Sequence, residues 1–161
     1  MKLVRMFALA TVGAALMAGD ALAQTSTQTV TFQVNAINQI SVSGTPSLLI
    51  NAATAGSAPT SVTSSGNTWA VTTNQSTAMI TASIPTAMPA GLTLSANLAA
   101  PAGATSTGLT ALGTTAVNVV TGITKLNASG LSLTYQLDAT AAAGVVTSAT
   151  RVVTFTITGG V

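Results

Sequence analysis

Short segments in which apolar and polar residues alternate recur along the chain, and this pattern constrains the fold more than any other feature. Thr, Val, Ile and Ser are frequent in these segments, as is usual for half-buried strands. Alternation places every second side chain on one face of a strand, whereas an amphipathic helix needs a period of 3.6 residues. The pattern therefore predicts a chain made of β-strands.

The predicted strands lie at spacings typical of a β-sandwich. They cover residues 30–34, 40–42, 48–50, 69–73, 78–84, 92–98, 117–119, 131–137 and 153–157, with Ile123 just beyond the strand at 117–119. Turn-forming residues separate them at 64–67, 74–76, 89–91, 101–104 and 127–130, and residues 139–144 read as a loop rather than a helical turn. We expect an all-β fold, an Ig-like or jelly-roll β-sandwich of about eight to ten short strands.

The core should be built from the large apolar side chains that share a strand face with their neighbours. Burying such a side chain contributes about 1.5–3 kcal/mol. The residues predicted to be largely buried are Phe32, Ile40, Trp69, Leu94, Leu133, Tyr135, Phe155 and Ile157.

The first residues have the pattern of a cleaved secretory signal peptide. Lys2 and Arg5 precede an apolar run over residues 6–18, and Ala21 to Ala23 form an A-x-A cleavage site. The alternative is a retained membrane anchor, but the run is shorter than the ~20 residues that a membrane span needs. We expect residues 1–23 to be removed, residues 24–161 to form one domain of 161 − 23 = 138 residues, and no membrane span in it. The protein is then secreted, either extracellular or at the cell surface.

Charge is almost absent from residues 24–161, where only Lys125, Asp138 and Arg151 are charged. The chain has no His, Cys or Glu. Acid–base, nucleophilic and metal-assisted catalysis need paired carboxylates, imidazole, thiolate or an activated nucleophile. We therefore expect no enzyme, and we assign no catalytic, cofactor-binding or metal-binding residue. Two isolated cations cannot neutralise a row of phosphates, so no nucleic-acid partner is expected.

For several residues the sequence allows a functional role but favours a structural one. Asp138 has no second carboxylate beside it and reads as a turn or cap residue. Trp69 could be a sugar-stacking platform, but it is in phase with Val71 and reads as a core residue. Asn74 and Asn127 begin N-x-S sequences that match the glycosylation acceptor, and both also fit β-turns.

The lack of charge also predicts that the protein associates with other chains through its edge strands. Exposed edge strands are normally protected by Lys, Pro or inward-pointing charges, because bare edges recruit other chains. The segment from Thr29 to Val34, called here the 29–34 segment, alternates, is apolar on one face and lacks Pro and Gly. It is either the first strand of the sandwich or a strand donated to a neighbouring subunit.

Three stretches carry a resemblance: residues 29–44, Trp69 to Asn74, and Val152 to Thr158. Through them the chain resembles small exported bacterial β-sandwich proteins. In general shape it is similar to fibre-forming subunits of biofilm matrices and bundling pili, which polymerise by donating an N-terminal strand. Unlike many chaperone–usher pilins, this chain has no disulfide, and the resemblance implies no site residues.

These observations favour a structural subunit of an extracellular fibre, pilus or surface layer, assembled by N-terminal strand donation. Its expected partner is another copy or a related subunit, bound through edge strands. The alternative is a monomeric carbohydrate-binding or adhesion module, for which a carbohydrate would be the partner.

Overall fold

The computed structural model describes residues 23–160, so the expected signal peptide lies outside the described residues apart from Ala23. The chain divides into two units, residues 1–33 and residues 34–161. In the first unit, residues 23–33 are exposed and form neither strand nor helix.

The expected strand over residues 30–34 is therefore absent, and the prediction that Phe32 is buried is wrong. The side chains of Val30, Phe32 and Val34 are 72%, 89% and 77% exposed. Alternation favours an extended backbone, but a strand also needs a neighbouring strand to complete its hydrogen bonds. Among the described residues, sheet assignments begin only at Asn38, so residues 30–34 belong to neither sheet.

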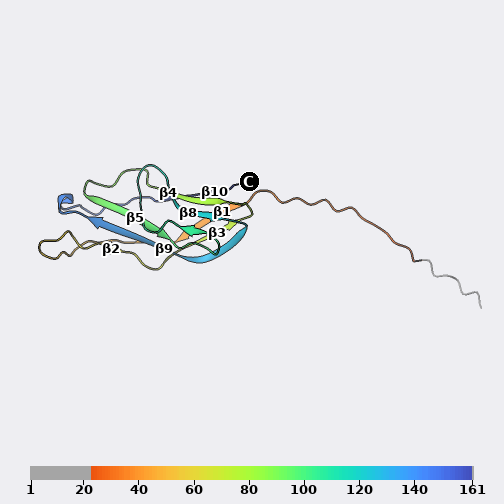
Figure 1. Cartoon of the computed structure of the whole chain (residues 1–161), viewed down its shortest axis with the longest axis horizontal. Coiled ribbons are helices and arrows are strands. Elements are labelled where there is room, and N and C mark those ends of the chain that lie inside the picture. Colours follow the sequence, from red (N-terminus) through yellow and green to blue (C-terminus); the bar gives the residue numbers. More distant parts are fainter. Residues whose placement is uncertain (1–22, 161) are drawn as a thin grey trace, which may run out of the picture. The chain divides into compact units, whose positions relative to one another are not determined.

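The second unit is all-β, with two antiparallel sheets. Figure 1 shows the sheets, whose strands run roughly along the longest axis of this unit. The strands are β1 (Asn38–Ser43), β2 (Val62–Thr63), β3 (Asn67–Thr73), β4 (Ala78–Ser83), β5 (Leu92–Leu98), β6 (Thr105–Ser106), β7 (Thr110–Ala111), β8 (Val117–Ile123), β9 (Leu126–Ala139) and β10 (Thr154–Thr158). The expected number of strands is confirmed.

One sheet has six strands and the other four. The larger has the order β1-β3-β9-β5-β7, with β2 also paired to β9, and the smaller has the order β10-β4-β8-β6. The long strand β9 holds the larger sheet together, because β3 and β2 pair along one of its edges and β5 along the other. Each sheet has an edge strand at either side: β1 and the two-residue β7 in the larger sheet, and β10 and the two-residue β6 in the smaller.

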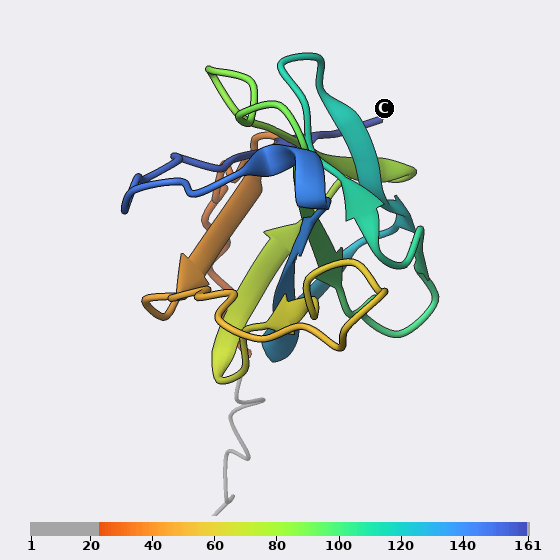
Figure 2. The ribbon, with the colours of Figure 1, turned by 90° about the vertical axis from the view of Figure 1, so that its left-hand side faces the viewer.

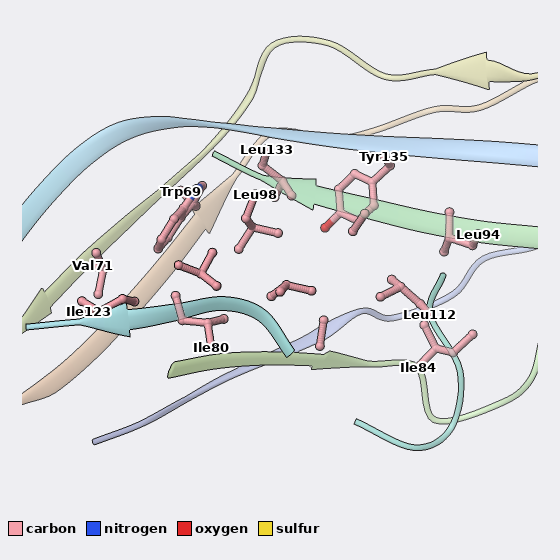
Figure 3. Packing of buried hydrophobic residues seen from close by; sticks show 14 of the residues in the cluster. Trp69, Val71, Ile80, Ile84, Leu94, Leu98, Leu112, Ile123, Leu133 and Tyr135 are labelled. Atoms are coloured by element: carbon pink, nitrogen blue, oxygen red, sulfur yellow. The ribbon is translucent and has the colours of Figure 1, made fainter. Parts of the chain in front are cut away.

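A single hydrophobic core lies between the sheets, as expected for a β-sandwich. The larger sheet contributes Trp69, Leu98 and Leu133, and the smaller contributes Ile80 and Val119, all with 2% exposure or less. Figure 3 shows side chains from both sheets pointing toward each other. Burial alternates along β3 and β4, as the sequence period predicts.

The predicted core is confirmed in the central strands and incomplete at the edges. Trp69, Leu94, Leu133 and Tyr135 are buried. Ile40 of β1, with Phe155 and Ile157 of β10, are only half-buried. Edge strands have a neighbour on one side only, so their inward side chains keep contact with solvent.

Two of the turns each depend on a glycine at the third of their four residues. The Leu92 N–H donates to the Pro89 carbonyl at 3.0 Å, and the Ala104 N–H to the Pro101 carbonyl at 3.1 Å. The third residues, Gly91 and Gly103, have φ values of 80° and 81°. Type II turns require this positive φ at that position, which glycine adopts without steric cost.

Three sequence predictions about local structure fail. Residues 48–50 form no strand. The turn predicted at 127–130 lies inside β9, where Gly130 (φ 66°) occupies a β-bulge opposite the stretch between Trp69 and Val71. Gly130 thus allows β9 to accommodate an extra residue, and the chain does not reverse direction here. The loop predicted at 139–144 contains one turn of 3-10 helix, η1 (Ala141–Ala143).

Within residues 23–160, no helix is long and apolar enough to span a membrane.

Candidate functional site

The three charged residues of residues 24–161 do not form a common site, and no ion pair links them in the described part of the chain. Asp138 lies inside β9 near its end and is half-buried, so the prediction of a turn or cap residue is wrong. Its Oδ1 accepts hydrogen bonds from Ser61 Oγ and, at 2.9 Å, from Gln136 Nε2. The carboxylate thus ties the chain before β2 to β9 and has a structural role.

Lys125 and Arg151 lie in connecting segments. Lys125 is exposed, has a φ of 41°, and its backbone N–H donates to the Gln75 carbonyl at 2.9 Å. Arg151 is half-buried and donates from Nη1 to the Thr150 carbonyl at 2.9 Å and from Nη2 to the Ala87 carbonyl at 3.2 Å. Its guanidinium therefore joins the chain before β10 to the loop after β4.

Trp69 is a core residue, with 1% exposure. Its indole Nε1 is buried and has no hydrogen-bond partner. Because a sugar-stacking ring needs a free face, Trp69 cannot serve as such a platform in this fold.

The two N-x-S sequences lie in different settings. Asn74 follows β3, and its Oδ1 accepts from Ile37 N at 2.8 Å while its Nδ2 donates to the Asn35 carbonyl at 2.7 Å. This side chain fixes the residues that lead into β1. Asn127 is exposed within β9. The turn interpretation is thus confirmed for residues 74–76 and wrong for Asn127.

A groove lies at the end of the sheets where β5 begins and β9 ends. Its volume is about 860 Å³. We call it the end groove. One wall consists of residues 47–53, which follow the edge strand β1, and the other of residues 143–149 and Arg151, which precede the edge strand β10. Figure 2 looks at this end, with the first wall in orange and yellow and the second in blue.

The inner surface of the end groove continues the hydrophobic core. Leu137 shares its strand face with Leu133 and Tyr135, and Leu92 shares its face with Leu94. Both Leu92 and Leu137 are only half-buried. The rows of core side chains thus run into the groove, where Leu92 and Leu137 keep partial contact with solvent.

In both walls, backbone N–H and C=O groups lack hydrogen bonds to other backbone groups. In the described residues, no backbone–backbone hydrogen bond involves residues 47–51 or 145–151. Backbone N–H and C=O groups in this arrangement can pair with an added strand. Apolar side chains exposed beside them include Leu49 at 70% and Val145 at 100%.

The turn at the start of β5 shapes the groove. A side chain on Gly91 would come within 2.7 Å of Ala143 N and 2.8 Å of its Cα, so η1 packs directly on the backbone of this turn. The Thr140 N–H donates to the Gly91 carbonyl at 2.9 Å. This packing and this hydrogen bond fix the chain that follows β9, where the second wall of the groove begins.

The end groove suits apolar contact and backbone pairing rather than bond-breaking chemistry. Arg151 is its one charged lining residue. The groove was not predicted from the sequence. Its walls contain large apolar residues such as Leu49 and Val145 but show no sustained alternation.

The comparisons with known proteins give no relative: no protein-family model, no curated protein and no solved structure matches this chain.

Proposed function

We propose that this protein is an exported structural subunit of an extracellular fibre, pilus or surface layer, and that it assembles by donating its 29–34 segment. The observation that carries the proposal is the exposure of that segment's apolar face. Val30 and Phe32 are 72% and 89% exposed, in a stretch with no Pro, Gly or charge. Exposed apolar side chains in a regular row mark an interaction surface.

The edges of the two sheets support the same function. The strands β1 and β10 contain no Lys, Arg, Asp, Glu or Pro, and each has one neighbour. Protected monomers normally carry such residues at their edges. An Ig-like or jelly-roll sandwich is the finer fold that we propose for these sheets.

The first test is electron microscopy and sedimentation of the chain purified after export. We expect filaments from the wild-type chain and none from Phe32→Asp, because assembly would bury an unpaired carboxylate. The free energy of unfolding should change by less than about 0.5 kcal/mol, since Phe32 is exposed.

The matched control is Thr31→Asp, which adds the same charge on the opposite face of the segment. It should still form filaments. Deletion of residues 24–34 should abolish filaments and leave a folded, β-rich monomer. If the wild-type chain stays monomeric at high concentration and binds a carbohydrate, the alternative function, a monomeric adhesion module, replaces the proposed fibre subunit.

A further inference from the structure

The edge strands β1 and β10, one from each sheet, lie on the same side of the second unit and converge at one end. In the orientation that satisfies both its polar atoms, the Asn38 carboxamide accepts from Gly159 N at 3.2 Å and donates to Thr73 Oγ1 at 2.6 Å. The start of β1 is thus fixed to the residue that follows β10. From this point β1 and β10 run in opposite chain directions toward the other end.

At that other end the edges are no longer joined, and the end groove lies between them. Residues 47–53 continue from β1, and residues 143–149 lead toward β10. Neither wall is part of a sheet, apart from an isolated bridge between Ala53 and Pro59. The edge strands β1 and β10 are therefore joined at one end, called here the closed end, and the segments that continue from them flank the end groove at the other.

We infer that the end groove is the acceptor site for the 29–34 segment of a second copy of this chain. This inference rests on the proposed function and adds the place where the donated strand binds. The donated strand completes the hydrogen bonds of the walls, and its apolar face covers Leu92 and Leu137.

The dimensions of the two partners agree. A six-residue strand is about 20 Å long, at ~3.3 Å per residue. The walls whose backbone is unpaired have five residues (47–51) and seven residues (145–151). Val30, Phe32 and Val34 project from the same face of an extended segment, so all three can enter the apolar interior of the groove together.

The charges agree as well. The 29–34 segment is uncharged, and the one charged residue at the groove, Arg151, already donates to two backbone carbonyls. Binding would therefore bury no charge of the donated segment, and the charge that it covers further is the Arg151 guanidinium, whose buried Nε has no hydrogen-bond partner. A nucleic acid or an acidic peptide would find no cluster of cations here.

The position of the groove sets the direction of assembly. Ile37 and Asn35 are held by Asn74 at the closed end of the sandwich, and the groove lies at the opposite end of β9. The root of the donor strand and the acceptor are thus on opposite ends of the second unit. Such a heterologous, head-to-tail contact can be repeated from copy to copy, and it produces an open filament when the rotation between subunits does not close a ring.

A filled groove provides the first test. Ala139 is half-buried at the end of β9 and lines the groove, so Ala139→Trp should occupy the space of the donated strand. We expect loss of filaments, with unchanged β-structure by circular dichroism. The control is Ala102→Trp, on an exposed turn outside the groove, which should still polymerise.

Mixing two inactive chains makes the test specific. The Phe32→Asp chain keeps its groove, and the Ala139→Trp chain keeps its donor segment. Neither should form filaments alone, while the mixture should give a one-to-one dimer and nothing longer, measured by analytical ultracentrifugation. If Ala139→Trp polymerises like the wild type, the groove is not the acceptor, although the proposed function stands.

Cysteine cross-linking covers the case in which Ala139→Trp fails to fold. The chain has no Cys, so introduced thiols react only with one another. Chains with Val30→Cys, Phe32→Cys or Val34→Cys are each mixed with a mass-tagged Ala139→Cys chain and oxidised. At least one should give a mixed disulfide, which needs Cα atoms within about 7 Å.

The control for cross-linking is Thr124→Cys, which is exposed at the closed end. No mixed disulfide should form with it. Equal cross-linking to both positions, or none to Ala139→Cys while wild-type filaments form, overturns the acceptor assignment alone. Absence of wild-type filaments overturns the proposed function itself.

Discussion

The middle of the sandwich and its groove end contain similar apolar residues in opposite environments. In the middle, Leu98, Ile80 and Val119 are fully buried between two sheets. At the groove end, Leu49 and Val145 are exposed, and Leu92 and Leu137 are only partly covered. The difference lies in the number of strands available and not in hydrophobicity. The groove end has the composition of a core that a single chain leaves incomplete.

The largest expected effect comes from deleting the same side-chain atoms in the two regions. Leu98→Ala should lower the free energy of unfolding by about 2–5 kcal/mol, because it leaves a cavity in a packed core. Leu49→Ala should change it by less than about 0.5 kcal/mol, since Leu49 is 70% exposed. Urea denaturation of both variants as monomers measures this. Equal losses would show that the groove wall is packed in solution.

A smaller effect should distinguish two glycines with the same backbone conformation. Gly91 and Gly103 have φ values of 80° and 81°, so Ala at either position carries a similar backbone strain of about 1–2 kcal/mol. Only Gly91 is covered, because Ala143 packs on it, while nothing lies within 4 Å of a side chain at Gly103. Gly91→Ala should therefore cost about 1–3 kcal/mol more than Gly103→Ala in thermal or urea unfolding. A difference near zero would mean that η1 does not hold the wall of the end groove.

The smallest effect concerns Tyr135, which lies between the packed middle and the groove. Burial raises the pKa of its phenol above the ordinary value of about 10. The unfolded chain thus loses this proton at a lower pH than the folded chain. Stability should be unaffected by this group below pH 10 and should fall as pH rises beyond it. Urea titrations from pH 8 to 11 measure the decline, and Tyr135→Phe should remove it.

The sequence pattern predicted the paired strands well. Residues 92–98 and 69–73 alternate and lie in strands that contact β9, so local period and tertiary pairing favour the same structure. The confirmed burial of Trp69 and Leu133 follows from the same agreement.

The failed predictions for residues 30–34 and 127–130 have one physical cause: a local sequence pattern does not show whether a pairing strand is present. Residues 30–34 alternate as clearly as residues 131–137, but the first stretch has no strand beside it and the second has two. Likewise, Asn127 to Gly130 have turn-forming side chains, yet pairing with β3 keeps them in β9 as a bulge. Alternation records the tendency of a segment to pair, whereas the presence of a partner depends on the rest of the fold. The end groove was not predicted, because only the tertiary fold brings residues 47–53 and 143–149 to the two sides of one concavity.

The turn over residues 74–77 holds both the residues that precede β1 and those that follow β10. Asn74 binds Ile37 N, and side chains on Gly159 and Gly160 would run into Asn38, Gln75 and Thr77. A fluorescent protein or affinity tag placed after Gly160 would therefore emerge beside the residues that lead into β1, at the end of the second unit opposite the end groove. By contrast, cargo inserted at Gly56, in the exposed hairpin that follows residues 47–53, would stand beside the end groove. The fold thus offers one attachment point for engineering at each end of the second unit, and strand donation as we propose it predicts that only the second interferes with assembly.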